Sequence, residues 1–313
     1  MTAGLIYVII KNTGILTIMC PGDSMLRTSE IHIRDPFVLV HGGKYYLYGS
    51  RGDETWGHCT GLDVYVGTDL ENWEGPINCF TPPEGFWSDF NFWAPEVHFV
   101  NGKFRMFVSF KSETRHRGTQ ILVSDTPTGN FVPMTDYPVT PADWECLDGT
   151  LYTDPEGKHS IVFCREWTQV GNGEICAMPL SDDLTAPAGE PCVLFRAGDT
   201  GWSRSVTGTP RDLVTDGPFL YTAGSGRLIM LWSGYSENGY AVAAAYSADG
   251  GLYGGWTHDP NLICDRNGGH GMLFRALSGE LMFVMHSPNT VGAERPLFVH
   301  AADTGDSVIL LDR

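Results

Sequence analysis

The chain has 313 residues, of which 12% are aromatic, and its formal net charge at pH 7 is −17. Such an acidic balance excludes nucleic acids and anionic membranes as expected partners, because both attract clustered Lys and Arg. Thirty-eight glycines and nineteen prolines are typical of a turn-rich protein made of strands. The eight cysteines form no C-x-x-C pair, which disfavours a zinc site. We expect Cys164 and Cys176, both within apolar runs, to be small buried side chains.

Residues 1–24 form an extra segment of uncertain status ahead of the repeated part of the chain. Two apolar runs flank Lys11-Asn12, and this interruption disfavours a membrane-spanning helix. A charged start and a convincing cleavage site are missing for a signal peptide, although Cys20 is compatible with a lipoprotein leader. We therefore favour an initiation at Met25 or an extra strand, and a cytoplasmic protein. Secretion is the alternative, if residues 1–24 act as a signal.

The repeated part opens with Arg34-Asp35-Pro36 at the start of an apolar run. Gly42-Gly43 follows, and then a second apolar run over residues 45–48. Two short apolar runs separated by a tight Gly-containing turn predict a pair of antiparallel strands. An Asp before Pro is by itself only a common turn residue, so the significance of Asp35 depends on repetition.

The same pattern of strand, turn and strand returns four more times. The five copies start at Asp35, Ala94, Asp148, Asp216 and His270. A third strand is expected within each copy, over residues 62–66, 120–123, 174–177, 241–245 and 297–299. A long period made of short strands is the signature of a propeller, whose blades bury their apolar faces only by stacking around an axis. The sequence predicts an all-β, five-bladed β-propeller over residues 25–313.

The residues that open the first strands are candidates for a functional site. In a propeller the first strand of each blade lines the axis, so the five openings meet in one funnel. Asp35, Asp148 and Asp216 would bring three carboxylates there, which packing alone does not explain. His270 stands among three glycines, which fits a metal or substrate role better than a core role, with a structural histidine as the alternative.

Other side chains near these openings are candidates for holding a substrate. Trp93 directly precedes a strand opening and would form a wall of a sugar site, or else fill the core. Glu145 and Glu166 are either near the axis or solvated charges at strand ends. Charged side chains beside the openings would bind sugar hydroxyls or a carboxylate. The full set of expected substrate contacts is Arg34, Trp93, Glu145, Glu166, Trp167 and Arg295.

Converging carboxylates in an aromatic-rich funnel suit glycoside hydrolysis. That reaction needs one carboxylic acid to protonate the leaving oxygen and one carboxylate on the opposite face of the sugar. A third carboxylate would raise the pKa of the acid by like-charge repulsion. No nucleophile elbow, phosphate-binding loop or dinucleotide fingerprint supports another enzyme class.

The chain resembles glycoside hydrolase family 43, whose members are five-bladed propellers that act mostly on arabinose- and xylose-containing polysaccharides with inversion. The resemblance covers the chain from Ile31 onward. It rests on five motifs in the family's blade order: Arg34-Asp35-Pro36-Phe37, Trp93-Ala94-Pro95-Glu96-Val97-His98, Leu147-Asp148-Gly149, Asp216-Gly217-Pro218 and Gly269-His270-Gly271.

The resemblance implies a role for each axial residue. Asp35 would be the general base that activates water, Asp148 would tune and orient the acid, and Asp216 would be the general acid. His270 would match a histidine that contacts a central calcium ion or its waters, so a structural Ca²⁺ is expected near it, while the chemistry needs no cofactor. The partner is an oligosaccharide, and the oligomeric state stays open.

The general acid departs from the family pattern, which has Glu where this chain has Asp216. The side chain is one methylene shorter, and a misplacement of about 1 Å can cost about a hundredfold in rate. Either the backbone lies closer to the substrate, or Glu145 or Glu166 supplies the proton, or the enzyme is slow. Glu145-Cys146 also resembles a pair in the invertase-type family, but that family has its Arg-Asp-Pro in the second blade, whereas here it lies in the first.

The function that these observations favour is an inverting, exo-acting glycosidase. We expect it to remove terminal α-L-arabinofuranosyl or related pentosyl residues from plant-derived oligosaccharides. A β-xylosidase and an endo-1,5-α-L-arabinanase are the enzyme alternatives. A carbohydrate-binding propeller with impaired catalysis is the alternative from another class, and the shorter acid at Asp216 motivates it.

Overall fold

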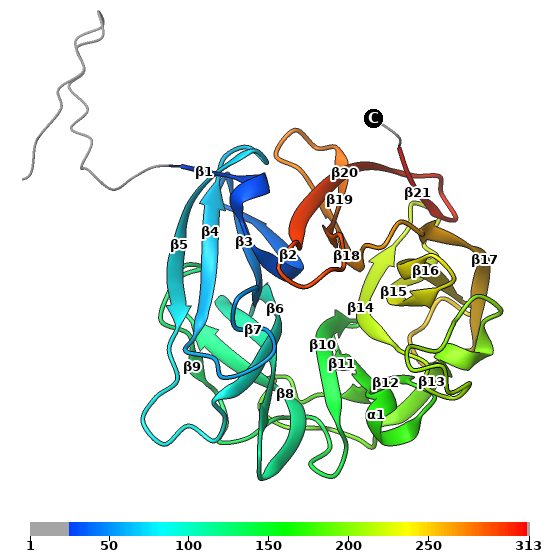
Figure 1. The fold of residues 1–313 in the computed structure, drawn as a ribbon, viewed down its shortest axis with the longest axis horizontal. Coiled ribbons are helices and arrows are strands. Elements are labelled where there is room, and N and C mark those ends of the chain that lie inside the picture. Colours follow the sequence, from blue (N-terminus) through cyan, green and yellow to red (C-terminus); the bar gives the residue numbers. More distant parts are fainter. Residues whose placement is uncertain (1–24, 312–313) are drawn as a thin grey trace, which may run out of the picture.

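The computed structural model describes residues 25–311, so the expected extra segment over residues 1–24 lies outside the described part of the chain. Five antiparallel sheets stand around a common axis (Figure 1). Four sheets have four strands each, and the first has a fifth strand at its outer edge. This confirms the predicted five-bladed, all-β propeller. The expected third strands all form.

Each blade is a meander in which neighbouring strands in sequence pair with each other. Blades 1 and 2 consist of β2 (Ile33–His41), β3 (Lys44–Arg51), β4 (Leu62–Gly67), β5 (Asn72–Phe80), β6 (Phe90–Val100), β7 (Lys103–Ser112), β8 (Arg115–Ser124) and β9 (Val132–Pro133). Blade 3 consists of β10 (Cys146–Thr153), β11 (His159–Arg165), β12 (Glu174–Pro179) and β13 (Cys192–Arg196). Blades 4 and 5 consist of β14 (Asp216–Thr222), β15 (Leu228–Ser236), β16 (Gly239–Ser247), β17 (Trp256–Cys264), β18 (Gly269–Arg275), β19 (Leu281–Ser287), β20 (Arg295–Asp303) and β21 (Val308–Leu310).

Little else is regular. The short strand β1 (Leu26–Arg27) pairs with the outer strand of blade 1 and leads into a 3₁₀ turn, η1 (Thr28–Glu30). A second 3₁₀ turn, η2 (Ala197–Asp199), follows β13, and the four-residue helix α1 (Trp167–Val170) follows β11. Among residues 25–311, no helix is long and apolar enough to cross a membrane.

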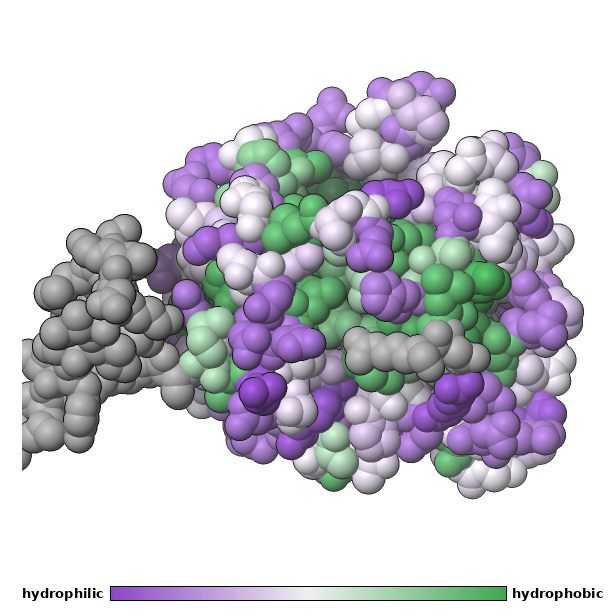
Figure 2. All heavy atoms as spheres, turned by 90° about the horizontal axis from the view of Figure 1, so that it is seen from above, coloured by the Kyte–Doolittle hydropathy of each residue, from purple (hydrophilic) through white to green (hydrophobic). Residues whose placement is uncertain are grey.

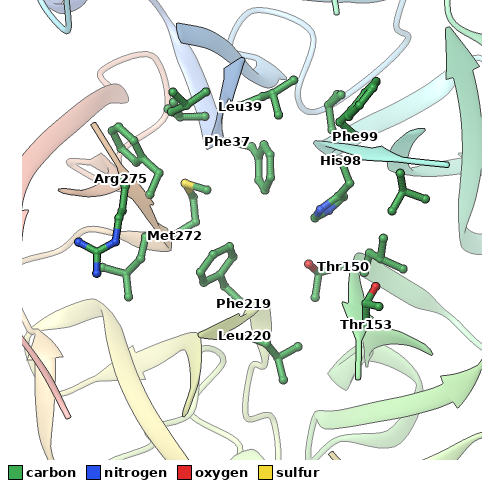
Figure 3. Close-up of a pocket in the computed structure, with 17 residues that line it drawn as sticks. Phe37, Leu39, His98, Phe99, Thr150, Thr153, Phe219, Leu220, Met272 and Arg275 are labelled. Carbon is green, nitrogen blue, oxygen red and sulfur yellow. The ribbon is translucent and has the colours of Figure 1, made fainter. Parts of the chain in front are cut away.

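The first strands of the five blades line the axis, as predicted. Beyond their bulged starts, the five first strands β2, β6, β10, β14 and β18 together enclose a cavity of about 590 Å³ (Figure 3). Each strand contributes a side chain to its centre: Phe37, His98, Thr150, Phe219 and Met272. None of the expected catalytic carboxylates lines this cavity. They stand at the starts of the same strands, so the two ends of the axis differ in chemistry.

The apolar core lies between neighbouring blades. Because both faces of a blade are covered, its inner strands read as nearly continuous apolar runs, as in β15 and β16. Between blades 1 and 2, Phe80 of β5 packs against Phe92 and Phe110 of blade 2, which meet each other edge to face with ring centres 4.7 Å apart. Such pairs contribute about 0.5–1.5 kcal/mol beyond their burial. Cys164 and Cys176 are fully buried, as expected, and Figure 2 shows hydrophilic residues with smaller hydrophobic patches on the outside.

The ring closes between blades 5 and 1 through side chains. Within the described residues, no strand from one end of the chain completes the blade at the other end. Instead, the buried carboxylate of Glu294 lies 2.9 Å from Arg34 Nη1 and 3.4 Å from His32 Nε2. Arg295 Nε donates a hydrogen bond of 3.0 Å to the Ser29 carbonyl. Glu294 and Arg295 therefore supply polar contacts to this seam, and apolar contacts such as the stacked rings of Trp73 and Phe298 add to them.

Candidate active site

A β-bulge interrupts the start of every first strand. In each blade, three steps along the first strand are matched by two steps along the second. The residue after the last paired position has a left-handed backbone conformation, with φ between 47° and 55°. These residues are Asp35, Ala94, Asp148, Gly217 and His270. A bulge re-aims the side chain it carries, so the five positions are equivalent around the axis. Non-glycine residues in this conformation store roughly 1–3 kcal/mol each, which is typical of functional sites.

We expected the carboxylates of blades 1, 3 and 4 to occupy equivalent positions at the axis, and this expectation is wrong for blade 4. The residue equivalent to Asp35 there is Gly217, whereas Asp216 occupies the paired position that Arg34 holds in blade 1. Position 217 requires a glycine for two reasons. Its φ is 51°, and a Cβ added to it would lie 2.8 Å from Cγ of His270. The acidic side chain of blade 4 therefore enters the site one residue earlier than those of blades 1 and 3.

The bulged amides are held by the neighbouring blade. Ala94, Asp148 and His270 each donate their backbone N–H to a serine Oγ of the preceding blade, at 2.8–2.9 Å. The three acceptors are Ser50, Ser109 and Ser233. Cys164 stands at the equivalent place in blade 3, and there the Gly217 N–H binds the Asp148 carboxylate instead, at 2.9 Å.

Asp35 lies among positively polarised groups. The Ser50 hydroxyl donates a 2.6 Å hydrogen bond to its Oδ2, and His270 Nδ1 lies 3.3 Å from its Oδ1. Burial by itself would raise the pKa of Asp35, but His270, the Arg34 guanidinium and the Ser50 hydroxyl outweigh it. The pKa of Asp35 is held below its usual value, so this carboxyl is ionised at neutral pH.

A buried histidine fixes the position of Asp35. The Asp35 backbone N–H donates to His286 Nδ1 at 3.1 Å, so this nitrogen carries no proton. Nε2 then donates to Asn289 Oδ1 at 3.2 Å, and the same oxygen accepts a 2.8 Å bond from Arg34. Burial lowers the pKa of His286 to about 4, so the ring is neutral. Sequence reasoning missed both His286 and Asn289.

Asp148 and His270 lie at the centre of the site. His270 Nδ1 is 3.7 Å from Asp148 Oδ2, so the imidazole stands between Asp148 and Asp35. Burial and the charge of Asp35 raise the pKa of Asp148 well above its usual value. Through its bond to the Gly217 amide, Asp148 also fixes the backbone next to Asp216.

Asp216 lies in an apolar, acidic environment. Its Oδ2 accepts a 3.0 Å hydrogen bond from the Tyr240 hydroxyl, and Tyr240 stacks on His286 with 5.6 Å between ring centres. Burial and the neighbouring Asp148 raise the pKa of Asp216 to about 7. The structure thus brings the three expected carboxylates together and pushes the pKa values of Asp35 and Asp216 in opposite directions.

The surroundings of His270 do not by themselves form a calcium site. Ca²⁺ takes six to eight oxygen ligands. Within residues 25–311, no group of three or more His, Cys, Asp or Glu side chains is placed to hold a metal ion. His270 instead directs Nδ1 at two carboxylates. The described side chains alone do not provide the ligands that this ion needs. A calcium held mainly by waters stays a prediction.

Three expected substrate contacts converge on a residue that sequence reasoning missed, Arg117. The Arg117 guanidinium lies 3.7 Å over the Trp93 ring, and its Nε donates to Glu166 at 3.4 Å. Its backbone N–H donates to Glu145 at 2.8 Å. Trp93 also donates its indole N–H to the Thr55 carbonyl, so neither its nitrogen nor one face is free for a sugar.

Glu145 is unsuited to protonate a leaving group. Lys111 and His116 lie 3.2 and 2.8 Å from its carboxylate oxygens. Burial would raise the pKa of Glu145, but hydrogen bonds from His116, Arg117 and Lys111 outweigh it and hold the pKa below its usual value. A carboxyl that stays ionised cannot donate a proton, so this geometry favours Asp216 over Glu145.

The other expected contacts lie in different places. Arg34 binds Asn289 and Glu294 next to the site. Trp167 opens α1, between β11 and β12 of blade 3, and is partly buried. Arg295 belongs to the seam, where its hydrogen bonds go to three backbone carbonyls, so the structure does not bring it to the carboxylates. A better exposed aromatic is Trp56, 58% accessible, whose ring meets that of Trp93 edge to face at 5.3 Å.

Some of the missed residues have a signal in the sequence. Ser50, Ser109 and Ser233 each lie toward the end of the apolar run of a second strand, so a search for repeated hydroxyls would have found them. Arg117, Tyr240 and His286 have none, because each meets its partner only through the tertiary fold.

Proteins of known structure share this fold. The structure matches that of an endo-arabinase from Bacteroides thetaiotaomicron VPI-5482 with a TM-score of 0.84 and 37% identity, over 91% of this chain and 100% of that one. A thermostable family-43 glycoside hydrolase shares the fold, with a TM-score of 0.76 and 22% identity over 90% of this chain and 93% of that one.

Two curated relatives match over shorter stretches. Extracellular endo-alpha-(1->5)-L-arabinanase 1 of Bacillus subtilis (strain 168) is 24% identical over 44% of this chain. A xylosidase/arabinosidase of Bacteroides ovatus is 26% identical over 43% of this chain. These matches span 45% and 44% of the relatives themselves, just under half of their length. The sequence also matches the family described as glycosyl hydrolases family 43 over residues 28–304. With its five blades and converging carboxylates, the chain belongs to glycosyl hydrolases family 43.

Proposed function

We propose that the protein hydrolyses arabinofuranosyl linkages of plant-derived oligosaccharides with inversion. The observation that carries this proposal is that the pKa values of two carboxyl groups in one site are shifted in opposite directions. The pKa of Asp35 is lowered, and the pKa of Asp216 is raised to about 7. Pairs of carboxyl groups separated in this way are typical of a base and an acid that work in one site.

Each carboxyl group has a distinct task in the proposed reaction. Ionised Asp35 takes a proton from a water molecule as its oxygen attacks the anomeric carbon. Protonated Asp216 gives its proton to the glycosidic oxygen as the bond from that oxygen to the anomeric carbon breaks. Burial and the neighbouring Asp148 keep the pKa of Asp216 high, and Asp148 accepts the adjacent Gly217 N–H at 2.9 Å. His270 and Arg34 stabilise the ionised form of Asp35.

The choice of arabinofuranosyl linkages is supported by the relatives. The endo-arabinase from Bacteroides thetaiotaomicron is 37% identical over its whole chain, and the Bacillus subtilis relative is an arabinanase. Attack on terminal residues is the mode that the sequence favours. The similarity to the endo-arabinase favours a second candidate, cleavage of internal bonds in α-1,5-linked arabinan.

Product analysis tests these proposals. The protein is incubated with linear α-1,5-arabinan, arabino-oligosaccharides and aryl β-xylosides, and new reducing ends are followed by NMR. Inversion gives the β-anomer of arabinofuranose first, whereas initial α-anomer contradicts the proposed mechanism. Free arabinose as the first product indicates terminal attack, and shorter oligosaccharides indicate internal attack. Stabilisation by these sugars without any hydrolysis supports the binding propeller instead.

A further inference from the structure

Arg117 lies beside the acidic centre of the site. It is two residues before Thr119 on β8, so the two side chains leave the same face of the strand. The Thr119 hydroxyl accepts the N–H of Gly149, the neighbour of Asp148, at 3.2 Å. The positive charge of Arg117 reaches Asp148 as well, because it lowers the pKa that burial and Asp35 raise. Arg117 on β8 therefore lies near Asp148 of the neighbouring strand β10.

The guanidinium of Arg117 is buried with an unused donor. The residue is 4% exposed, and its Nη1 is buried without a hydrogen-bond partner among the described residues. Its one ion pair, to Glu166, is long at 3.4 Å. By contrast, Arg34 binds its partners at 2.8 and 2.9 Å, and Arg51 forms a two-pronged pair with Asp63 at 2.6 and 2.7 Å. Burying a charged donor unpaired is costly, so a partner is expected in the working enzyme.

The surrounding residues keep this donor in place. Glu145 holds the backbone, Glu166 holds Nε, and the Trp93 ring lies under the guanidinium plane. Rigid support of a binding group by its neighbours is what recognition of a ligand needs. Three residues expected to touch the substrate therefore act as positioning residues for Arg117.

We propose that Arg117 binds the sugar ring that lies against Asp148 by donating Nη1–H to one of its hydroxyl oxygens, so that it selects sugars that carry this hydroxyl. The inference rests on the proposed function, since it assigns a contact within that substrate site. The acceptor is a neutral hydroxyl because Glu166 and Asp148 already oppose the charge of the guanidinium. A hydrogen bond from a charged donor is worth about a hundredfold in affinity or rate.

A cycle of protein and substrate changes tests this contact. Wild type and Arg117→Met are assayed with an aryl α-L-arabinofuranoside and its 2-, 3- and 5-deoxy analogues. We expect one deoxy analogue to lower kcat/KM of the wild type about a hundredfold, and to lower that of Arg117→Met hardly further, because the variant has already lost the donor. The proposal is overturned if the loss in kcat/KM caused by Arg117→Met multiplies with the loss caused by every deoxy analogue, because a purely structural role of Arg117 would give that result.

Two further variants separate binding from folding. Arg115→Met is the matched control: Arg115 also lies on β8, but its guanidinium lies 3.8 Å over the Tyr137 ring. This control should keep the wild-type preference among the analogues. Arg117→Lys keeps a charge without the planar fork and should restore part of the selectivity. If Arg117→Met retains the wild-type melting temperature but also the full wild-type preference, the proposal is wrong.

The test separates this inference from the proposed function. If the wild type cleaves xylosides and not arabinosides, the proposed sugar is wrong, and the same cycle is run with deoxy-xylosides. If nothing is cleaved, the cycle is measured as binding affinity by calorimetry with the sugar that binds. Tighter binding of an aryl glycosiduronate than of the neutral glycoside, lost in Arg117→Met, overturns the neutral hydroxyl as the acceptor.

Discussion

Blades 1 and 4 both present an aspartate to the axis, but the two surroundings differ in almost every respect. Asp35 has the Ser50 hydroxyl, the His270 imidazole and the Arg34 guanidinium nearby, and its pKa is lowered. Asp216 has the Tyr240 hydroxyl and the like charge of Asp148, and its pKa is raised to about 7. One repeated strand opening therefore carries a carboxyl group with a lowered pKa in one blade and a carboxyl group with a raised pKa in another.

The two aspartates also differ by one residue in their position along the first strand of the blade. Asp35 is the bulged residue of its blade, whereas Asp216 is the residue before the bulge. Because of this displacement, the Gly217 amide donates to Asp148, and this bond links the backbone beside Asp216 to the Asp148 carboxyl. The lesson is that the propeller supplies equivalent places, and the neighbouring blades decide what each carboxyl does.

The largest effect is expected from neutralising the blade 1 carboxylate. Asp35→Asn should lower kcat by about 10³–10⁴-fold, because the water loses its general base. The loss should be the same for substrates with good and poor leaving groups, since proton donation is untouched. Steady-state rates on aryl arabinofuranosides and on arabino-oligosaccharides measure it. Asp182→Asn, at an exposed position, is the control, and a loss below tenfold for Asp35→Asn would refute the assignment.

Neutralising the blade 4 carboxyl should give a loss that depends on the leaving group. Asp216→Asn should slow natural oligosaccharides about 10²–10³-fold and a dinitrophenyl arabinofuranoside less than tenfold, because only a poor leaving group needs the proton. Glu145→Gln and Glu166→Gln should show no such dependence, as both carboxylates hold Arg117. Equal losses on both substrates for Asp216→Asn would remove Asp216 from the role of acid.

The pH dependence of kcat/KM should reveal the ionisation of both carboxyl groups. Since Asp216 must be protonated, kcat/KM should fall as the pH rises through about 7. Since Asp35 must be ionised and its pKa is held below its usual value, the low-pH limb should lie below the ordinary titration range of an aspartate, about pH 4. The raised pKa of Asp216 also stabilises the fold below about pH 4, and this contribution is lost as the pH rises through 7. Rates and melting temperatures between pH 3 and 9 measure both. Asp216→Asn should flatten the stability change between about pH 4 and 7.

The smallest effect is expected from the hydrogen bond that blade 4 gives its own acid. Tyr240→Phe removes the donor that favours ionised Asp216, so the pKa of Asp216 should rise further. One such bond is worth about 1 kcal/mol, so the high-pH limb should move up by about 0.7 pH units. Tyr235→Phe is the control, because its hydroxyl is bonded to Asn289. A limb that moves down in Tyr240→Phe would contradict this account.

Local signals were enough to predict the architecture and half of the site. The repeated apolar runs with their tight turns predicted five blades, and the openings at Asp35, Asp148 and His270 were placed correctly at the axis. The partners of these groups could not be predicted, because they come from other blades. Asp35 and His286, for example, are 251 residues apart in the chain yet joined by a 3.1 Å hydrogen bond. Arg295 was misplaced for the same reason, since proximity in sequence to Glu294 did not show that it faces Ser29.

The sequence by itself determined that short strands repeat five times and that acidic residues open three of the first strands, because strand periodicity and turn chemistry are local properties. Only the tertiary structure decided that Gly217 rather than Asp216 carries the bulge in blade 4, and that Arg117 keeps a buried donor free. Both depend on side chains of adjacent blades meeting at the axis. Their distances and burial set the protonation of each carboxyl, and the order of residues in the chain does not contain that information.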